Sequence, residues 1–315
     1  MERSTVIANG LQAAILLGAF GALTTVILWP QLGSFGVLVS LAGASFILLL
    51  VMRMPPAMLM RIYGARPYEA GDLAQYDRVI GELAHRAGLA SPPRLYVVPS
   101  MQLSAFSFGT RQRFAIAVTE GLLRRLTMRE VAGILAREVA HAQRGDLPLF
   151  GIADFISRCA QGFYYTGLFF AALNALRAIG GAEPVSWVSV VLLVAAPLLM
   201  SLLQLSLSRA REVAVDRAGA LLTGDPLGLA SAIARLEAGP GNPLDDLLPP
   251  VPARKVPLPS MLRYSPSAER RIALLNTFQA PPIPLLDTEE TPRISLIGVG
   301  PIEMRPRYRL SGVWF

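Results

Sequence analysis

The sequence is poor in the side chains that build disulfide frameworks and common metal sites. Among 315 residues there is one cysteine, Cys159, and there are two histidines, His85 and His141. One cysteine excludes an internal disulfide and a zinc site with four cysteine ligands. Charged residues are also scarce, at 16% against about 25% in an average soluble protein, while 53% of residues are hydrophobic. This composition excludes a disordered chain and favours a membrane protein over a soluble enzyme.

The basic excess points to a membrane surface. The chain has 29 basic and 22 acidic residues, for a net charge of +7. Basic residues form no dense run, and they concentrate beside long apolar stretches. A nucleic-acid-binding protein would gather them into a patch or stripe. The pattern therefore predicts the lipid bilayer as a partner and no nucleic acid.

Two apolar stretches near the N-terminus predict a membrane hairpin. No charged residue lies between Ser4 and Met52, and turn residues at Trp29–Gly33 divide this stretch into spans at 6–29 and 35–52. Each approaches the ~20 apolar residues that cross a ~30 Å hydrocarbon layer as helix. A signal peptide is excluded because the apolar run is too long and a second span follows it.

A second hairpin is predicted in the middle of the chain. Residues 159–176 and 184–208 contain no charged side chain. The second of these is a strong candidate for a membrane span. The first contains Gln161 and Asn174, so a buried or re-entrant helix is an alternative to full crossing.

Two hairpins would return the chain to its starting side, so both polar regions should face one compartment. Of the 29 basic residues, only Arg177 lies in a loop assigned to the opposite side. Retention of basic residues on the cytoplasmic side predicts an inner-membrane protein whose polar regions face the cytoplasm. Arg53, Arg61 and Arg66, behind the second span, and Arg209 and Arg211, behind the fourth, are expected at the lipid headgroups.

Between the membrane segments, apolar periodicity predicts a mixed domain. Helical spacing covers 72–89, short strands are expected at 94–98 and 114–119, and 103–109 can pair with the latter as a hairpin. Thr127 and Glu130 form a capping box that starts a further helix. We therefore expect a mainly α integral membrane protein of about four transmembrane helices with a cytoplasmic α+β domain. Its expected parts are a transmembrane hairpin at 1–52, half of the cytoplasmic domain at 53–158, a second hairpin at 159–208, the other half at 209–278 and a Pro-rich tail at 279–315.

The helix that follows the capping box carries a sequence close to a metallopeptidase motif. In His-Glu-x-x-His the two histidines, four residues apart, hold zinc, and the glutamate is the general base for the metal-bound water. Here the five residues read Arg137-Glu138-Val139-Ala140-His141. The surrounding segments are Ser104-Ala105-Phe106-Ser107-Phe108-Gly109, Ala117-Val118-Thr119-Glu120-Gly121, Gly145-Asp146, Arg211-Glu212 with Asp216, and Leu222-Thr223-Gly224-Asp225-Pro226. In content and order they resemble the HtpX-type membrane zinc metallopeptidases, relatives of the prenyl-protein processing peptidases.

This resemblance implies a zincin-like peptidase domain, a zinc cofactor and a role in membrane-protein quality control. It implies Glu138 as general base, His141 and Glu212 as zinc ligands, and Asp216 as a group that orients a ligand. It also implies that a strand containing Ser104, Ala105, Phe106 and Ser107 binds the peptide substrate.

The departures from the motif argue against zinc binding. Arg137 stands where the first zinc histidine belongs, and a guanidinium has no lone pair for a metal. Ser265 stands where the family has a His-Pro motif, Ser104 replaces an asparagine, and His85 lies on another helix without a companion ligand. Two protein ligands remain where catalytic zinc has three, and the permanent charge repels a divalent cation. Zinc is expected to bind weakly or not at all.

Three classes of function follow from these observations. The first is an inactive peptidase homologue that binds peptides or membrane-protein segments, or regulates an active relative or a second copy. In it Arg137 takes the place of the cation and pairs with Glu212 and Glu138, whereas the alternative is an outward Arg137 and a water-filled pocket. The second is an active zinc endopeptidase with unusual metal ligation. The third, a channel or transporter, is disfavoured because the spans contain no Asp, Glu, Lys or Arg.

Overall fold

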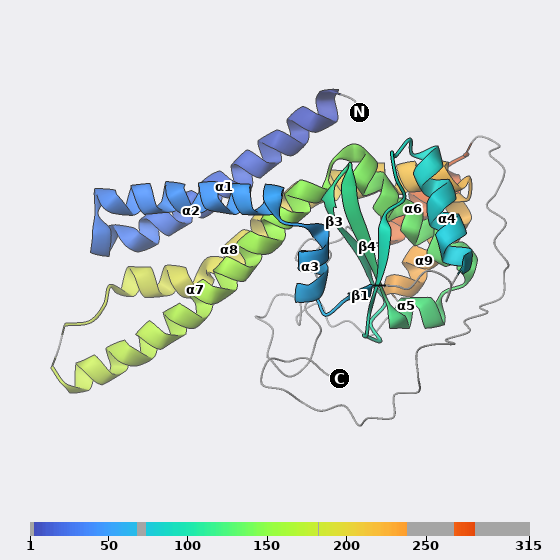
Figure 1. Ribbon diagram of the computed structural model, residues 1–315. Helices are drawn as coiled ribbons and strands as arrows, with labels where there is room; N and C mark the ends of the chain where they lie inside the picture. Colours follow the sequence, from blue (N-terminus) through green and yellow to red (C-terminus); the bar gives the residue numbers. More distant parts are fainter. Residues whose placement is uncertain (1–2, 68–73, 182, 238–267, 281–315) are drawn as a thin grey trace.

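The computed structural model describes residues 3–67, 74–181, 183–237 and 268–280. Figure 1 shows two parts: the long helices α1, α2, α7 and α8 extend to one side, and a small sheet with shorter helices lies on the other. Most of the expected Pro-rich tail at 279–315 lies outside the described residues. The shorter helices are α3 (Pro56–Ile62), α4 (Ala74–Arg86), α5 (Glu120–Arg125), α6 (Met128–Arg144), α9 (Pro226–Glu237) and α11 (Ala268–Thr277).

Three of the long helices contain a segment that is long and apolar enough to cross a membrane. These segments are Ile7–Leu32 in α1 (Arg3–Leu32), Ser34–Arg53, which is α2, and Trp187–Gln204 in α8 (Trp187–Thr223). Gly33, with a φ of +53°, forms the sharp turn between α1 and α2, a conformation that glycine adopts without strain. The described chain therefore contains the predicted N-terminal membrane hairpin and the strong span of the second pair.

Helix α7 (Leu147–Ile179) includes the uncertain span at 159–176. It is one continuous helix, which a re-entrant segment is not. Its large apolar side chains Tyr165, Leu168 and Phe169 are exposed, as in a lipid-facing helix. Asn174 is buried and satisfies both of its amide groups on the backbone of Val185, at 2.9 and 2.7 Å. These features support a fourth membrane crossing, which stays a prediction.

The sheet has four strands in the order β1-β2-β4-β3. The strands are β1 (Arg66–Pro67), β2 (Arg94–Val98), β3 (Ala105–Thr110) and β4 (Arg113–Thr119). β3 and β4 form the predicted antiparallel hairpin, β2 pairs with β4 in parallel, and β1 pairs with β2 in antiparallel orientation. β1 was not predicted because two residues carry no periodic signal. β3 is thus the outer strand on the side of the hairpin.

One hydrophobic cluster joins segments from both sides of the second membrane pair. It contains Leu83 of α4, Ile116 of β4, Leu135 of α6, Val215 of α8 and Leu275 of α11, all buried. Helix α8 therefore continues without a break from its membrane segment into the core of the domain. This packing brings the end of α8 against α6, where the motif residues lie.

Asp225 caps the start of α9 and holds it against α6. Its carboxylate accepts hydrogen bonds from the backbone N–H of Gly228 at 2.9 Å and from Arg129 Nη2 at 2.8 Å. Burial alone raises the pKa of Asp225, but the hydrogen bonds from Arg129 and Gly228 outweigh burial and hold it below its usual value.

Replacing Asp225 with alanine is expected to lower the free energy of unfolding by about 1–2 kcal/mol at neutral pH. Because the folded-state pKa is lowered, this contribution is complete above the unfolded pKa and disappears as the pH falls through the folded pKa. The native protein and the variant should therefore melt together in strong acid. Thermal unfolding measured across this pH range tests the prediction. Asp77→Ala, at an exposed position of α4, is the control. Equal losses of stability in both variants at neutral pH would contradict the prediction.

Candidate functional site

Helix α6 presents the motif residues to the interior of the domain. The helix begins with the predicted capping box of Thr127 and Glu130, and it ends at Gly145 in the left-handed conformation. Both ends are thus fixed by local sequence. The three motif residues Arg137, Glu138 and His141 are 8%, 2% and 2% exposed.

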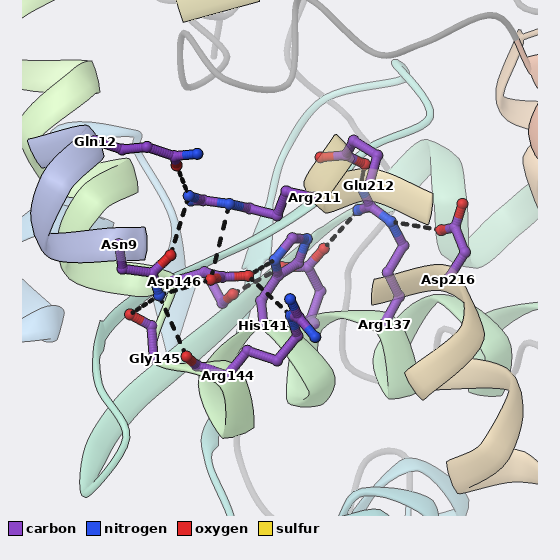
Figure 2. Close-up of polar contacts among 12 residues, drawn as sticks. Asn9, Gln12, Arg137, His141, Arg144, Gly145, Asp146, Arg211, Glu212 and Asp216 are labelled. Carbon is purple, nitrogen blue, oxygen red and sulfur yellow. Dashed lines mark hydrogen bonds and ion pairs between the residues drawn. The ribbon is translucent and has the colours of Figure 1, made fainter. Parts of the chain in front are cut away.

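The guanidinium of Arg137 lies among three carboxylates (Figure 2). Nη1 donates to Glu138 Oε1 at 3.1 Å, Nη2 donates to Glu212 Oε2, and Nε lies 3.3 Å from Asp216 Oδ1. Helix α8 approaches α6 closely here because Gly219 has no side chain; a Cβ at this position would lie 3.2 Å from the Arg137 backbone. Arg137 therefore faces the site and does not point outward.

A second arginine, which sequence reasoning did not assign a role, completes this charge cluster. Arg271 of α11 binds Asp216 with two hydrogen bonds, at 2.6 and 2.7 Å, and lies 3.9 Å from Glu212. Two guanidinium groups thus face the carboxylates of Glu138, Glu212 and Asp216. In the sequence, two adjacent arginines after a proline do not indicate a contact with Asp216. The contact depends on how α11 packs against α8.

The charges of the cluster reinforce one another. Burial by itself lowers the pKa of Arg137, but the charges of Glu212, Glu138 and Asp216 outweigh burial and raise it above its usual value. Burial raises the pKa of Glu212, whereas Arg137, His141 and Arg271 together lower it below its usual value. Arg137 and Glu212 are therefore an ion pair at neutral pH.

Both oxygens of the Glu138 carboxylate are engaged. Oε1 accepts the hydrogen bond from Arg137, and Oε2 accepts one from the hydroxyl of Ser107 at 2.7 Å. Ser107 belongs to β3, so this bond ties the outer strand of the sheet to α6. Ser107 is the predicted strand residue that the fold brings to the motif. The backbone N–H of Ser104 instead donates to the hydroxyl of the N-cap residue Thr119 at 3.0 Å, and Ala105 and Phe106 lie in hydrophobic clusters.

His141 is held by the residue that follows α6. Its Nδ1 lies 3.1 Å from Asp146 Oδ2, and its ring meets Phe150 edge-on at 4.7 Å. Burial raises the pKa of Asp146, but the hydrogen bond and charge of His141 and the charge of Arg211 outweigh burial and lower it. Asp146 is thus a carboxylate that fixes the imidazole.

Polar side chains of the first membrane helix reach this pair, as Figure 2 shows. Asn9 Nδ2 donates to Asp146 Oδ1 at 3.0 Å and to the carbonyl oxygen of Gly145 at 3.2 Å. Arg211 Nη2 donates to Asn9 Oδ1 at 3.1 Å and to Gln12 Oε1. Arg211 is buried by these contacts, so the expectation that it lies at the lipid headgroups is wrong. Sequence reasoning missed Asn9 and Gln12, although two amides three residues apart in an apolar span are a signal of one polar helix face.

The described residues do not form a zinc site. Within them there is no group of three histidine, cysteine, aspartate or glutamate side chains that could hold a metal ion. The position between Glu212 and Glu138 is filled by the Arg137 guanidinium, which offers a metal only N–H groups. His85 is exposed on α4 and does not join the cluster, as the sequence suggested. Ser265 lies outside the described residues.

A Glu-x-x-His helix faced by the Glu and Asp of a second helix, on a domain carried by membrane helices, defines the class of membrane metallopeptidase-like proteins. The model of peptidase family M48 matches residues 72–279, which is more than half of the chain, and the chain belongs to this family.

Curated relatives agree with this family. Protease HtpX of Legionella pneumophila (strain Lens) is 35% identical over 234 residues, which cover 73% of this chain and 81% of that protein. A Protease HtpX homolog of Burkholderia mallei (strain SAVP1) is 33% identical over 231 residues, covering 72% and 79%. Among solved structures, S. mikatae Ste24p is 18% identical with a TM-score of 0.43, and the match covers 87% of this chain and 66% of Ste24p.

Proposed function

We propose that this chain is an HtpX-like pseudopeptidase of the inner membrane, which binds peptide or membrane-protein segments on its cytoplasmic side without cleaving them. The observation that carries the proposal is the contact of Arg137 with Glu138, Glu212 and Asp216. A fixed positive charge in the place of zinc keeps the carboxylates of α6 and α8 paired. The domain can then keep its fold while the metal is absent.

The general base expected in an active relative is also unsuited to its task here. A base must have an oxygen available for the proton of the attacking water. The two oxygens of Glu138 already accept hydrogen bonds from Arg137 and Ser107. No hydrolytic step is therefore assigned to these residues.

Binding without cleavage is supported by the position of β3. It is the outer strand of the described sheet and lies against the motif helix through the Ser107–Glu138 bond. An outer strand is the element to which an extended peptide adds by backbone pairing. Segments next to membrane spans are the proposed clients, because the domain is carried on membrane helices.

Proteolysis assays with Glu138→Gln test this function. In an active peptidase this substitution removes the base, so hydrolysis of an unfolded protein should fall by orders of magnitude. Here the native chain and the variant are expected to give the same background rate of hydrolysis, and a zinc chelator is expected to have no effect on it. The Legionella protease HtpX serves as the positive control. Chelator-sensitive cleavage by the native chain that Glu138→Gln abolishes would favour the active enzyme with unusual metal ligation.

A further inference from the structure

Helix α3 lies where the second membrane helix enters the domain. It begins at Pro56, three positions after Arg53, the last residue of α2. In Figure 1 it runs across the end of α2, between that helix and the sheet. Met60 and the following Tyr63 are buried in a cluster with Phe106 and other side chains of the sheet, so α3 is fixed to the domain.

A second contact places α3 next to the point of α7 where the uncharged part of that helix begins. The guanidinium of Arg158 stacks on the ring of Tyr63 with its central carbon 4.8 Å from the ring centre, and it pairs with Asp154 at 3.0 Å. Arg158 is the last charged residue before the uncharged part of α7 that begins at Cys159. Both α2 and α7 contact or adjoin α3 where their apolar parts end or begin. Helix α3 therefore lies at the edge of the apolar part of the molecule.

The outer side of α3 exposes large apolar side chains. Met58 is 52% exposed and Ile62 is 47% exposed, and their spacing of four residues puts them on one face. The opposite face packs on the sheet. A short helix with apolar side chains on its free face, at the level where membrane helices end, has the features of an interfacial helix.

Exposed arginines surround this apolar pair. Arg53, Arg61 and Arg66 are exposed, and no acidic residue occurs in 53–67. The hairpin of β3 and β4 adds exposed Arg113, the first residue of β4. This hairpin packs on the start of α3, because a Cβ at Gly109 of β3 would lie 2.9 Å from Cγ of Pro56. No acidic residue occurs in 105–119 either. Positive charge beside exposed apolar side chains is complementary to an anionic leaflet.

We propose that α3 and the β3–β4 hairpin form a docking surface for anionic phospholipids of the adjacent leaflet. Met58 and Ile62 enter the boundary between headgroups and acyl chains. Arg53, Arg61, Arg66 and Arg113 pair with the lipid phosphates. The surface holds the outer edge of the sheet against the bilayer, and it is independent of whether the chain is a peptidase.

The single cysteine makes the depth of α3 measurable. In a Cys159→Ser background of the full chain, a fluorophore attached at Met58→Cys reports this surface, and one at Leu227→Cys, 56% exposed on α9, is the control. The protein is reconstituted in vesicles of phosphatidylcholine, alone or mixed equally with phosphatidylglycerol. Brominated lipid is expected to quench the label at position 58 and not at 227. The proposal is overturned if aqueous iodide quenches the label at position 58 as strongly as the label at position 227. Cross-linking of position 58 to a second copy of the chain also overturns it.

The charge preference is tested with the same label. Brominated phosphatidylglycerol should quench more strongly than brominated phosphatidylcholine, and the ratio gives a relative lipid affinity. Arg61→Gln with Arg113→Gln should lower this ratio by about fivefold per arginine. Arg78→Gln with Arg94→Gln removes the same charge from exposed positions on α4 and β2 and should leave it unchanged. Equal quenching by both lipids, or equal effects of the two pairs, overturns the proposal.

Discussion

Replacing Arg137 with histidine is expected to give a protein that binds about one zinc ion per chain, whereas the native chain binds essentially none. Histidines at 137 and 141 would project from one face of α6, toward Glu212 on α8, and so supply three protein ligands. The Nδ1 atom of His141 is already held by Asp146, which leaves the other ring nitrogen for a metal. Elemental mass spectrometry of the detergent-purified proteins measures the ratio.

The matched control for this experiment is Arg137→Gln. It removes the same positive charge but adds no ligand, so its zinc content should stay near that of the native chain. Gain of zinc by the histidine variant alone would show that one residue disables an otherwise intact scaffold. A native chain that carries one zinc ion would contradict the pseudopeptidase proposal. Attention would then turn to an unforeseen third ligand.

Reversing the charge of the same residue is expected to destabilise the fold strongly. In Arg137→Glu the buried carboxylates of Glu138, Glu212 and Asp216 lose a cation and gain a fourth carboxylate beside them, and the remaining charge of Arg271 compensates only in part. Removing one partner of a buried ion pair costs about 3–5 kcal/mol, and reversal adds repulsion. The melting temperature in detergent should fall by about 10 °C or more.

Arg129→Glu is the control for charge reversal on the same helix. Arg129 also pairs with an aspartate, Asp225, but its side chain is 42% exposed, so the expected loss is only about 1 kcal/mol. A variant at 137 that melts like the native protein would contradict the ion-pair role. It would favour the outward arginine and water-filled pocket that the sequence left open.

Much of the fold could be predicted because its signals are local. The charge-free stretches predicted the N-terminal membrane hairpin and the strong span of the second pair, and the Thr127–Glu130 capping box predicted the start of α6. Each of these signals depends on residues within a few positions of one another. The two-residue β1 and the seven-residue α3 were missed because they are too short for a periodic pattern.

The sequence by itself determined the family, the N-terminal membrane hairpin and the arginine in the first position of the metallopeptidase-like motif, because each of these can be read from residue types at fixed spacings. Only the tertiary structure decided which side chains surround that arginine. Arg137, Glu212 and Arg271 come from three helices, and the Ser107–Glu138 bond joins a strand to a helix. Asn9 reaches Asp146 across 137 positions of the chain. Such contacts depend on the packing of whole elements, and a spacing along one element contains no information about them.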